Sequence, residues 1–182
     1  MSNIIQVRLS GFGGQGIVLA GLLLGEAGVI DGRFVSGSNS YGAQARGSGC
    51  KSEVVFSEGP IDFPHLTIAD ILVAMSQGAY NMYCGEVKET SGLIFYDQGQ
   101  VIPKQELNVK QMGVPATEYA LKQLKNKQVA NIVLLGTLVE VTKIISPKAI
   151  RKAIHIHVGE RFRSLNLKAL RIGMGLGRRI HG

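Results

Sequence analysis

The chain has 182 residues, 45% of them hydrophobic and 18% charged, which fits one α/β domain and excludes a disordered protein. Its two cysteines, Cys50 and Cys84, form no CxxC pair, so neither an iron–sulfur cluster nor a zinc site can be built from this chain alone. The net charge of +7 comes from one end: residues 1–142 hold 10 Lys and Arg against 12 Asp and Glu, whereas residues 143–182 hold 10 Lys and Arg and one acid.

The first quarter of the chain predicts a strand, a glycine-rich turn and a helix. Residues 4–10 favour a buried strand, 11–16 (GFGGQG) a loop, and 17–30 a helix with a broad apolar face. A short second strand is predicted at 34–36. Residues 38–49 are so rich in Ser and Gly that they predict a functional loop instead of a regular element.

Strands and helices alternate along the rest of the sequence. Strands are predicted at 52–57, 70–75, 92–97 and 108–112, with a helix near 78–84. Later helices are predicted from Thr117 as N-cap, over 128–145, from the Ser146-Pro147 start signal to about Val158, and as a short last helix capped by Asn166.

This alternation predicts an α/β, Rossmann-like fold: a mostly parallel sheet with helices on both faces and a C-terminal helical extension. No linker divides the chain, so we expect a single domain over residues 1–182 with a basic helical tail from about residue 143. The sequence starts without a secretion signal and has no membrane-length apolar stretch. A cytoplasmic protein without membrane contact is therefore expected.

The loop Gly11–Gly16 satisfies GxGxxG between a strand and a helix. Its glycines allow a ligand to approach the backbone, and the helix N-terminus offers free N–H groups to an anion. The second strand ends without the acid that would hold a ribose, and no Gly-Lys-Ser/Thr follows, so NAD is disfavoured and a Walker A loop is excluded. The phosphate or pyrophosphate of another cofactor is favoured, and a tight turn without a ligand stays the alternative. The candidate cofactor-binding residues are Gly11, Phe12, Gly13, Gly14, Gln15 and Gly16.

A second candidate motif is SYGAQARG, at residues 40–47. The guanidinium of Arg46, flanked by Ala45 and Gly47, has the geometry to hold a phosphate or a carboxylate. Ser40 and Tyr41 are added to the candidates, since a tyrosine offers a flat apolar surface with a polar tip. The alternative is that Arg46 binds a carboxylate within the subunit.

The stretches GFGGQGIVLAG, SYGAQARG, DILVAMSQGAY and ANIVLLGTLVE together resemble the gamma subunit of the 2-oxoacid:ferredoxin (acceptor) oxidoreductases, the pyruvate/ketoisovalerate oxidoreductase gamma domain family. They cover most of residues 4–145 in the order found in that family. Because short gamma chains without fused partners are most similar to the 2-oxoglutarate type, 2-oxoglutarate is the expected oxoacid.

The resemblance implies a hetero-oligomeric enzyme that decarboxylates a 2-oxoacid on thiamine diphosphate, passes electrons through iron–sulfur clusters to ferredoxin or another acceptor, and releases an acyl-CoA. Thiamine diphosphate and the clusters are expected on partner subunits, so this chain has no expected catalytic residue or metal ligand and should be inactive alone. CoA is the cofactor that it is expected to contact, through the two loops.

The alternative function is a stand-alone nucleotide- or RNA-binding Rossmann-like protein that uses its basic tail. Nucleic acid is disfavoured, because Phe162 is the only aromatic residue from Lys143 onward and cannot provide a row of stacking surfaces.

Overall fold

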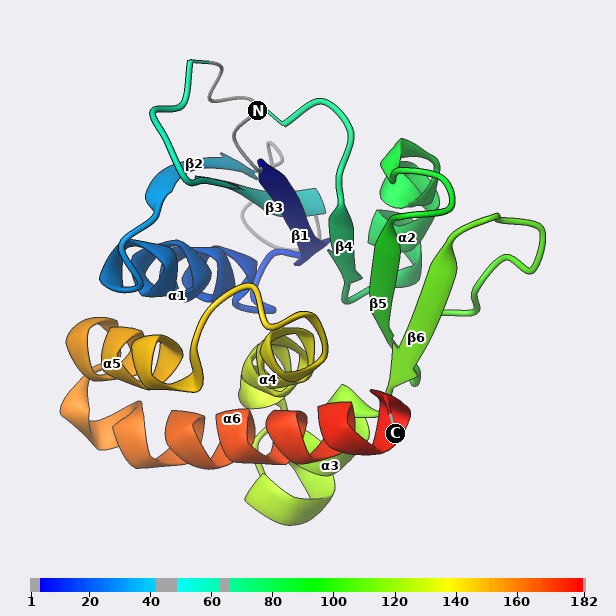
Figure 1. Ribbon diagram of the computed structural model, residues 1–182. Coiled ribbons are helices and arrows are strands. Elements are labelled where there is room, and N and C mark those ends of the chain that lie inside the picture. Colours follow the sequence, from blue (N-terminus) through cyan, green and yellow to red (C-terminus); the bar gives the residue numbers. More distant parts are fainter. Residues whose placement is uncertain (1–3, 42–48, 63–65, 182) are drawn as a thin grey trace.

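A six-stranded sheet in the order β2-β3-β1-β4-β5-β6 forms the centre of the computed structural model, which describes residues 4–41, 49–62 and 66–181 (Figure 1). β4 is parallel to β1 and to β5, and β5 is parallel to β6, whereas β3 is antiparallel to both β1 and β2. Among the described strands only β3 therefore runs against the rest, and the predicted mostly parallel α/β sheet is confirmed. The strands are β1 Ile5–Phe12, β2 Phe34–Tyr41, β3 Gly49–Ser57, β4 Ile71–Ala74, β5 Leu93–Asp97 and β6 Lys110–Val114.

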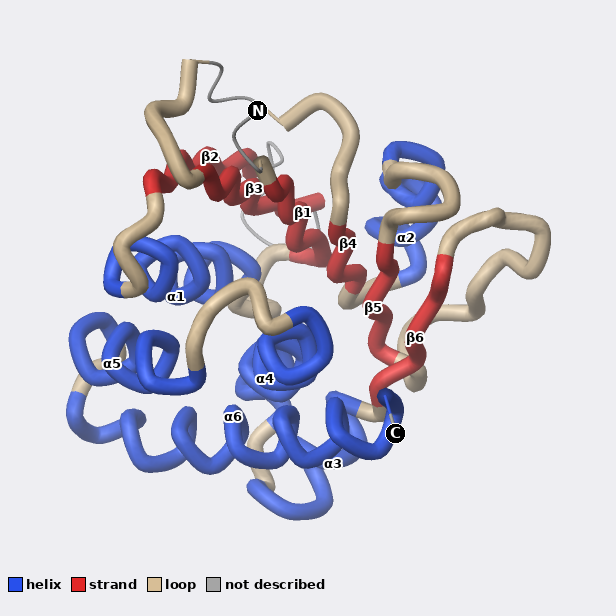
Figure 2. Tube along the Cα trace, in the orientation of Figure 1, coloured by secondary structure: helices blue, strands red, loops and turns tan. Residues whose placement is uncertain are grey.

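Helices cover the two faces of this sheet unequally. α1, α4, α5 and α6 gather on one side, and α2 lies on the other (Figure 2). Side chains alternate between the faces along a strand, so Ile71 and Val73 join the larger core while Leu72 and Ala74 join a smaller one with Tyr80 of α2. The helices are α1 Ile17–Ile30, α2 Gln77–Tyr83, α3 Ala116–Leu124, α4 Ala130–Thr142, α5 Pro147–His157 and α6 Glu160–His181, with short 3-10 turns at Cys84–Glu86 and Lys127–Val129.

Helix α4 is the central helix of the larger layer. Every residue from Ala130 to Val139 is buried, as expected for a helix that is apolar all round. α6 packs along it so closely that a Cβ on Gly173 would lie 2.0 Å from the carbonyl oxygen of Val133. The Thr137 hydroxyl donates to the Gly173 carbonyl at 3.0 Å. The two helices therefore meet backbone to backbone.

The predicted short last helix capped by Asn166 is wrong. α6 is one helix of 22 residues, and Asn166 lies inside it, donating to the Phe162 carbonyl at 2.9 Å. Glycine normally weakens a helix, but Gly173 and Gly177 here lie where a side chain would strike α4. Contact with α4 outweighs the low helix propensity of the tail.

Two N-terminal helix signals had different outcomes. Ser146 caps α5, accepting from the Ala149 N–H at 3.1 Å, as Ser146-Pro147 predicted. Thr117 is not the N-cap of α3, because Pro115 occupies that position. The Thr117 hydroxyl instead donates to the fully buried carboxylate of Asp97 at the end of β5, and thereby ties α3 to the sheet.

The prediction of an irregular loop over residues 38–49 is wrong at both ends, where the structure has strands. β2 continues to Tyr41, with Ser38 paired to Glu53 and Ser40 to Lys51 on β3, which itself begins at Gly49. Pairing with a neighbouring strand satisfies the backbone here and overrides the weak strand propensity of Ser and Gly. Residues 42–48, with Arg46, lie outside the described residues. No helix in the described ranges is long and apolar enough to cross a membrane.

Replacing Gly173 by Ala should destabilise the protein, because the new methyl would overlap the α4 backbone. Overpacking of this kind costs about 1–3 kcal/mol or more. Gly175 is the matched control, since it lies in the same helix and a Cβ there would meet no atom within 4 Å. Gly175→Ala should stabilise the helix by about 0.5–1 kcal/mol. Denaturant unfolding of the full chain measures both, and a Gly173→Ala protein as stable as the control would contradict the packing.

Candidate functional site

The glycine-rich loop lies at the carboxyl edge of the sheet, where its connections change direction. Gly11 and Phe12 end β1, and Gly16 is the N-cap of α1. From β1 the chain continues through α1 toward β2, whereas the neighbouring β4 leads through α2 toward β5 on the other side. Such a switch point is where open α/β sheets bind ligands.

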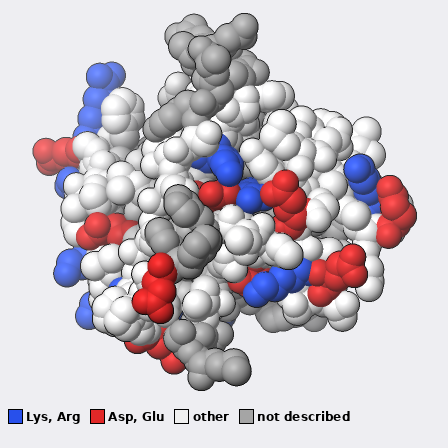
Figure 3. All heavy atoms as spheres, turned by 90° about the horizontal axis from the view of Figure 1, so that it is seen from above, with Lys and Arg blue, Asp and Glu red and all other residues white. Residues whose placement is uncertain are grey.

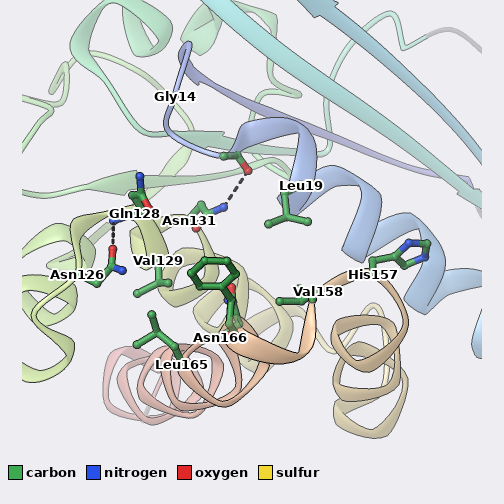
Figure 4. A pocket seen from close by; sticks show the side chains of 13 residues that line it. Gly14, Leu19, Asn126, Gln128, Val129, Asn131, His157, Val158, Leu165 and Asn166 are labelled. Carbon is green, nitrogen blue, oxygen red and sulfur yellow. Dashed lines mark hydrogen bonds between the residues drawn. The ribbon is translucent and has the colours of Figure 1, made fainter.

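Two side-chain amides fix the shape of this loop. The Gln15 Oε1 accepts from the Phe12 N–H at 2.7 Å, and its Nε2 donates to the Met75 carbonyl at 3.0 Å. The Asn131 Nδ2 donates to the Gly16 carbonyl at 2.8 Å (Figure 4). Gln15, a predicted cofactor-binding residue, thus has both ends of its amide bonded within the protein.

The glycines of the loop have different roles. A Cβ on Gly11 would lie 2.4 Å from Gln15 Oε1, and one on Gly16 would lie 2.4 Å from Asn131 Nδ2. Gly14 is exposed, with a φ of 95°, and a Cβ there would meet no protein atom within 4 Å. Gly11 and Gly16 therefore leave room for the side chains of Gln15 and Asn131, while the backbone of Gly14 faces open space.

One cavity beside Gly14, of about 350 Å³, is bordered by α1, α4 and the α5–α6 junction (Figure 4). We call it the amide cavity. Its polar groups include Asn131 and Asn166, with only 3% and 6% of their surfaces exposed. It is lined by Gly14, Gly16, Leu19, Asn126, Gln128, Val129, Asn131, His157, Val158, Gly159, Phe162, Leu165 and Asn166.

A second cavity, of about 290 Å³, opens on the other side of Gly14 at the ends of β1 and β4, and we call it the edge cavity. Its cation, Lys127, is exposed and forms no ion pair with any described residue. No local motif indicated Lys127 or Gln128 as site residues, because they lie more than a hundred residues after the loop and reach it only through the 3-10 turn before α4. The lining residues are Gly13, Gly14, Gln15, Met75, Thr117, Lys127, Gln128 and Ala130.

The second candidate motif starts at the same edge of the sheet. Tyr41 is paired with Cys50 of β3, and Cys50 is paired with Gly11 of β1. The backbone of Tyr41 therefore lies in register with the glycine-rich loop, two strands or roughly 10 Å away. Ser40 is one residue further from the edge, and Arg46 is outside the described part of the chain.

A buried charge cluster lies on the α2 face of the sheet and is satisfied internally. Arg8 binds Glu53 at 2.8 Å and also Glu86, and its guanidinium lies 4.6 Å above the ring of Tyr83. Burial raises the pKa of the Glu53 carboxyl, but the hydrogen bonds and charges of Lys51 and Arg8 outweigh it and hold that pKa below its usual value. Seen from above, charges of both signs are intermingled (Figure 3). This cluster braces β1, β3 and the turn after α2.

The described residues around the loop bring together groups that can bind an anion. None of their His, Cys, Asp and Glu side chains form a group of three or more that could hold a metal ion. Cys50 and Cys84 are both buried, and burial raises the pKa of the Cys50 thiol, which disfavours a reactive thiolate there. The loop offers backbone N–H groups and the neighbouring cation.

Comparison with known proteins identifies the family. The model of the pyruvate ferredoxin/flavodoxin oxidoreductase family matches residues 6–176. The 2-oxoglutarate synthase subunit KorC of Methanocaldococcus jannaschii is 43% identical, over 92% of this chain and 91% of that protein. The ketoisovalerate oxidoreductase subunit VorA of Methanothermobacter marburgensis is 30% identical, over 96% of this chain and 37% of that protein.

Solved structures share the fold over nearly the whole chain. The gamma subunit of a keto/oxoacid ferredoxin oxidoreductase from Geobacter sulfurreducens superposes with a TM-score of 0.88 at 35% identity, covering 98% of both chains. The 2-oxoglutarate:ferredoxin oxidoreductase of Magnetococcus marinus has the same fold, with a TM-score of 0.87 at 24% identity, over 98% of this chain and 32% of its own. The chain therefore belongs to the pyruvate ferredoxin/flavodoxin oxidoreductase family.

Proposed function

We propose that this protein is the gamma subunit of a 2-oxoacid:ferredoxin (acceptor) oxidoreductase whose oxoacid is 2-oxoglutarate. The observation that carries the proposal is the 43% identity with a 2-oxoglutarate synthase subunit KorC along almost the full length of both chains. The identity with the pyruvate synthase subunit PorC of Thermotoga maritima is lower, at 28%. The stand-alone nucleotide- or RNA-binding alternative has no support from these relatives.

The role of this chain in that enzyme is to hold CoA, whose thiol accepts the acyl group that is formed when the oxoacid loses carbon dioxide and two electrons. Three features of the site support the assignment: the open backbone at Gly14, the N-terminus of α1 beside it, and the unpaired Lys127 across the edge cavity. Backbone N–H groups at a helix N-terminus together with a lysine suit a pyrophosphate. The structure from Magnetococcus marinus, whose protein shares this fold, contains 2-oxoglutarate, coenzyme A and succinyl-CoA.

Thiamine diphosphate and iron–sulfur clusters belong to partner subunits in this proposal, and electrons leave through ferredoxin or another acceptor. The described side chains offer no group of metal ligands, and no buried acid faces the two cavities beside Gly14. The cytoplasmic location stays a prediction from the sequence.

The purified chain alone should be inactive and colourless. It should not reduce a viologen dye with 2-oxoglutarate and CoA, because it lacks the groups that would carry the electrons. The measurement is dye reduction together with the visible absorption spectrum, beside the assembled enzyme as the positive control. Oxoacid-dependent reduction by the chain free of other subunits would contradict the assignment as a non-catalytic subunit.

Gly14→Ala should raise the KM for CoA about tenfold in the assembled enzyme, because the methyl would occupy the space where a pyrophosphate meets the backbone; tenfold corresponds to about 1.4 kcal/mol. Gly32→Ala is the matched control. Gly32 also has a positive φ, of 81°, and open space around its Cβ, but it lies at the far end of α1. The backbone strain is thus similar, and the KM for CoA should stay within twofold.

The rate of the decarboxylation half-reaction, which does not need CoA, is measured in the same preparations. It distinguishes a loss of CoA binding from a failure of the subunits to assemble. Gly14→Ala should leave this rate intact. Arg46→Ala should also raise the KM for CoA, since loss of a charge-assisted hydrogen bond to the ligand costs about 1.5–3 kcal/mol. If Gly14→Ala and Gly32→Ala change the KM for CoA equally, the loop is not part of the CoA site. If Arg46→Ala dissociates the complex, the segment around Arg46 belongs to a subunit interface.

A further inference from the structure

Helices α5 and α6 lie on the outer side of the helical layer, away from the sheet (Figures 1 and 2). Two adjoining hollows, of about 200 and 390 Å³, share His155, Leu167 and Arg171 and so form one continuous groove. Arg151 lines it from α5, and Arg163 and Lys168 line it from α6. We call this surface the basic groove. Its polar lining consists of the cations Arg151, Arg163, Lys168 and Arg171 and the imidazole of His155.

The charges of this groove are not neutralised within the described structure. Within the described part of the chain, no ion pair involves any of its four cations, and the buried Nε of Arg163 has no hydrogen-bond partner. The groove contains one acid, Glu160. Outside the groove, Glu140 binds Lys143 at 2.6 Å and Arg178 at 3.3 Å, and Glu26 binds His157 at 3.1 Å. A concentration of unpaired positive charge of this kind attracts an acidic partner.

The dimensions of the groove favour an extended partner over a single phosphate. Arg163 and Arg171 are eight residues apart on one helix, which places them about 12 Å apart along its axis. One large apolar side chain of α5 next to His155, Ile156, is 54% exposed. Apolar contacts beside a polar rim are typical of protein–protein interfaces, whereas single-stranded nucleic acid is bound on rows of aromatic rings.

We infer that the basic groove docks an acidic surface of a partner protein and thereby holds this chain in its complex. The partner is a subunit of the same oxidoreductase, so this assignment rests on the proposed function. It is independent of the CoA site, because none of the groove residues lines the edge cavity or the amide cavity. Charge complementarity of this kind governs association rate and specificity and weakens with salt.

Reversal of two groove charges tests the assignment, in the full chain and against the other subunits of the enzyme. Removing the C-terminal residues is unsuitable, because Met174 and Leu176 of α6 are buried in the core. Arg151→Glu with Arg171→Glu leaves the core intact, since both side chains are exposed. The matched control is Lys104→Glu with Lys110→Glu, which makes the same change in net charge at exposed positions before and within β6.

The dissociation constant for the co-purified remaining subunits should rise about tenfold or more for the groove variant at 0.15 M salt, with a shallower salt dependence. It should change less than twofold for the control. Circular dichroism verifies that both are folded, and the milder Arg151→Gln with Arg171→Gln should show an intermediate loss. If the groove variant binds as tightly as the control, the assignment is overturned.

Two further probes identify the other possible occupants. Binding of inorganic pyrophosphate or of a single-stranded RNA 20-mer that is lost in the groove variant, with unchanged subunit association, would assign the groove to those ligands and overturn docking. If the unaltered chain fails to join any oxidoreductase subunit, the proposed function itself fails, and the groove assignment fails with it.

Discussion

The structure depends on the burial of one helix, α4. It is apolar on all sides, so it is stable only if it is covered all round. The sheet and α1 cover one side, and α6 covers the other by contact through Gly136 and Gly173. Without α6 the apolar far side of α4 would face water, so α6 completes the cover of this helix and is not a dispensable tail.

The same helix sets the geometry of the glycine-rich loop. Asn131, in the first turn of α4, is 3% exposed and holds the Gly16 carbonyl. Lys127 and Gln128, in the turn just before α4, line the edge cavity beside Gly14. The packing of α4 in the core therefore determines the geometry of the site, since a shift of α4 would move both Lys127 and the glycine-rich loop. This linkage gives the proposed binding site a rigid support.

Covering α4 also determines where the charges of the C-terminal segment lie. The buried face of α6 uses Ala169, Leu170 and the glycines, so its basic residues must lie on the outer faces. There Arg163, Lys168 and Arg171 face Arg151 and His155 of α5 across a groove. The basic groove and the loop thus lie on separate parts of the surface. This separation is what the two proposals require, since one places the cofactor at the loop and the other places a partner subunit at the groove.

The sequence by itself determined the α/β class, the α1 boundaries at Ile17–Ile30, the Ser146 cap and the family, because these depend on local periodicity, capping chemistry and motifs contiguous in the chain. It also located the glycine-rich loop, but it could not separate Gly11 and Gly16, which accommodate neighbouring side chains, from the open Gly14. Only the tertiary structure decided that the Ser-rich segment to Tyr41 is a strand, that the glycine-containing tail is a helix, and that Lys127 lies beside the loop. In each of these cases the deciding partner is distant in sequence, and pairing or close packing with it outweighs the local propensity of the residues.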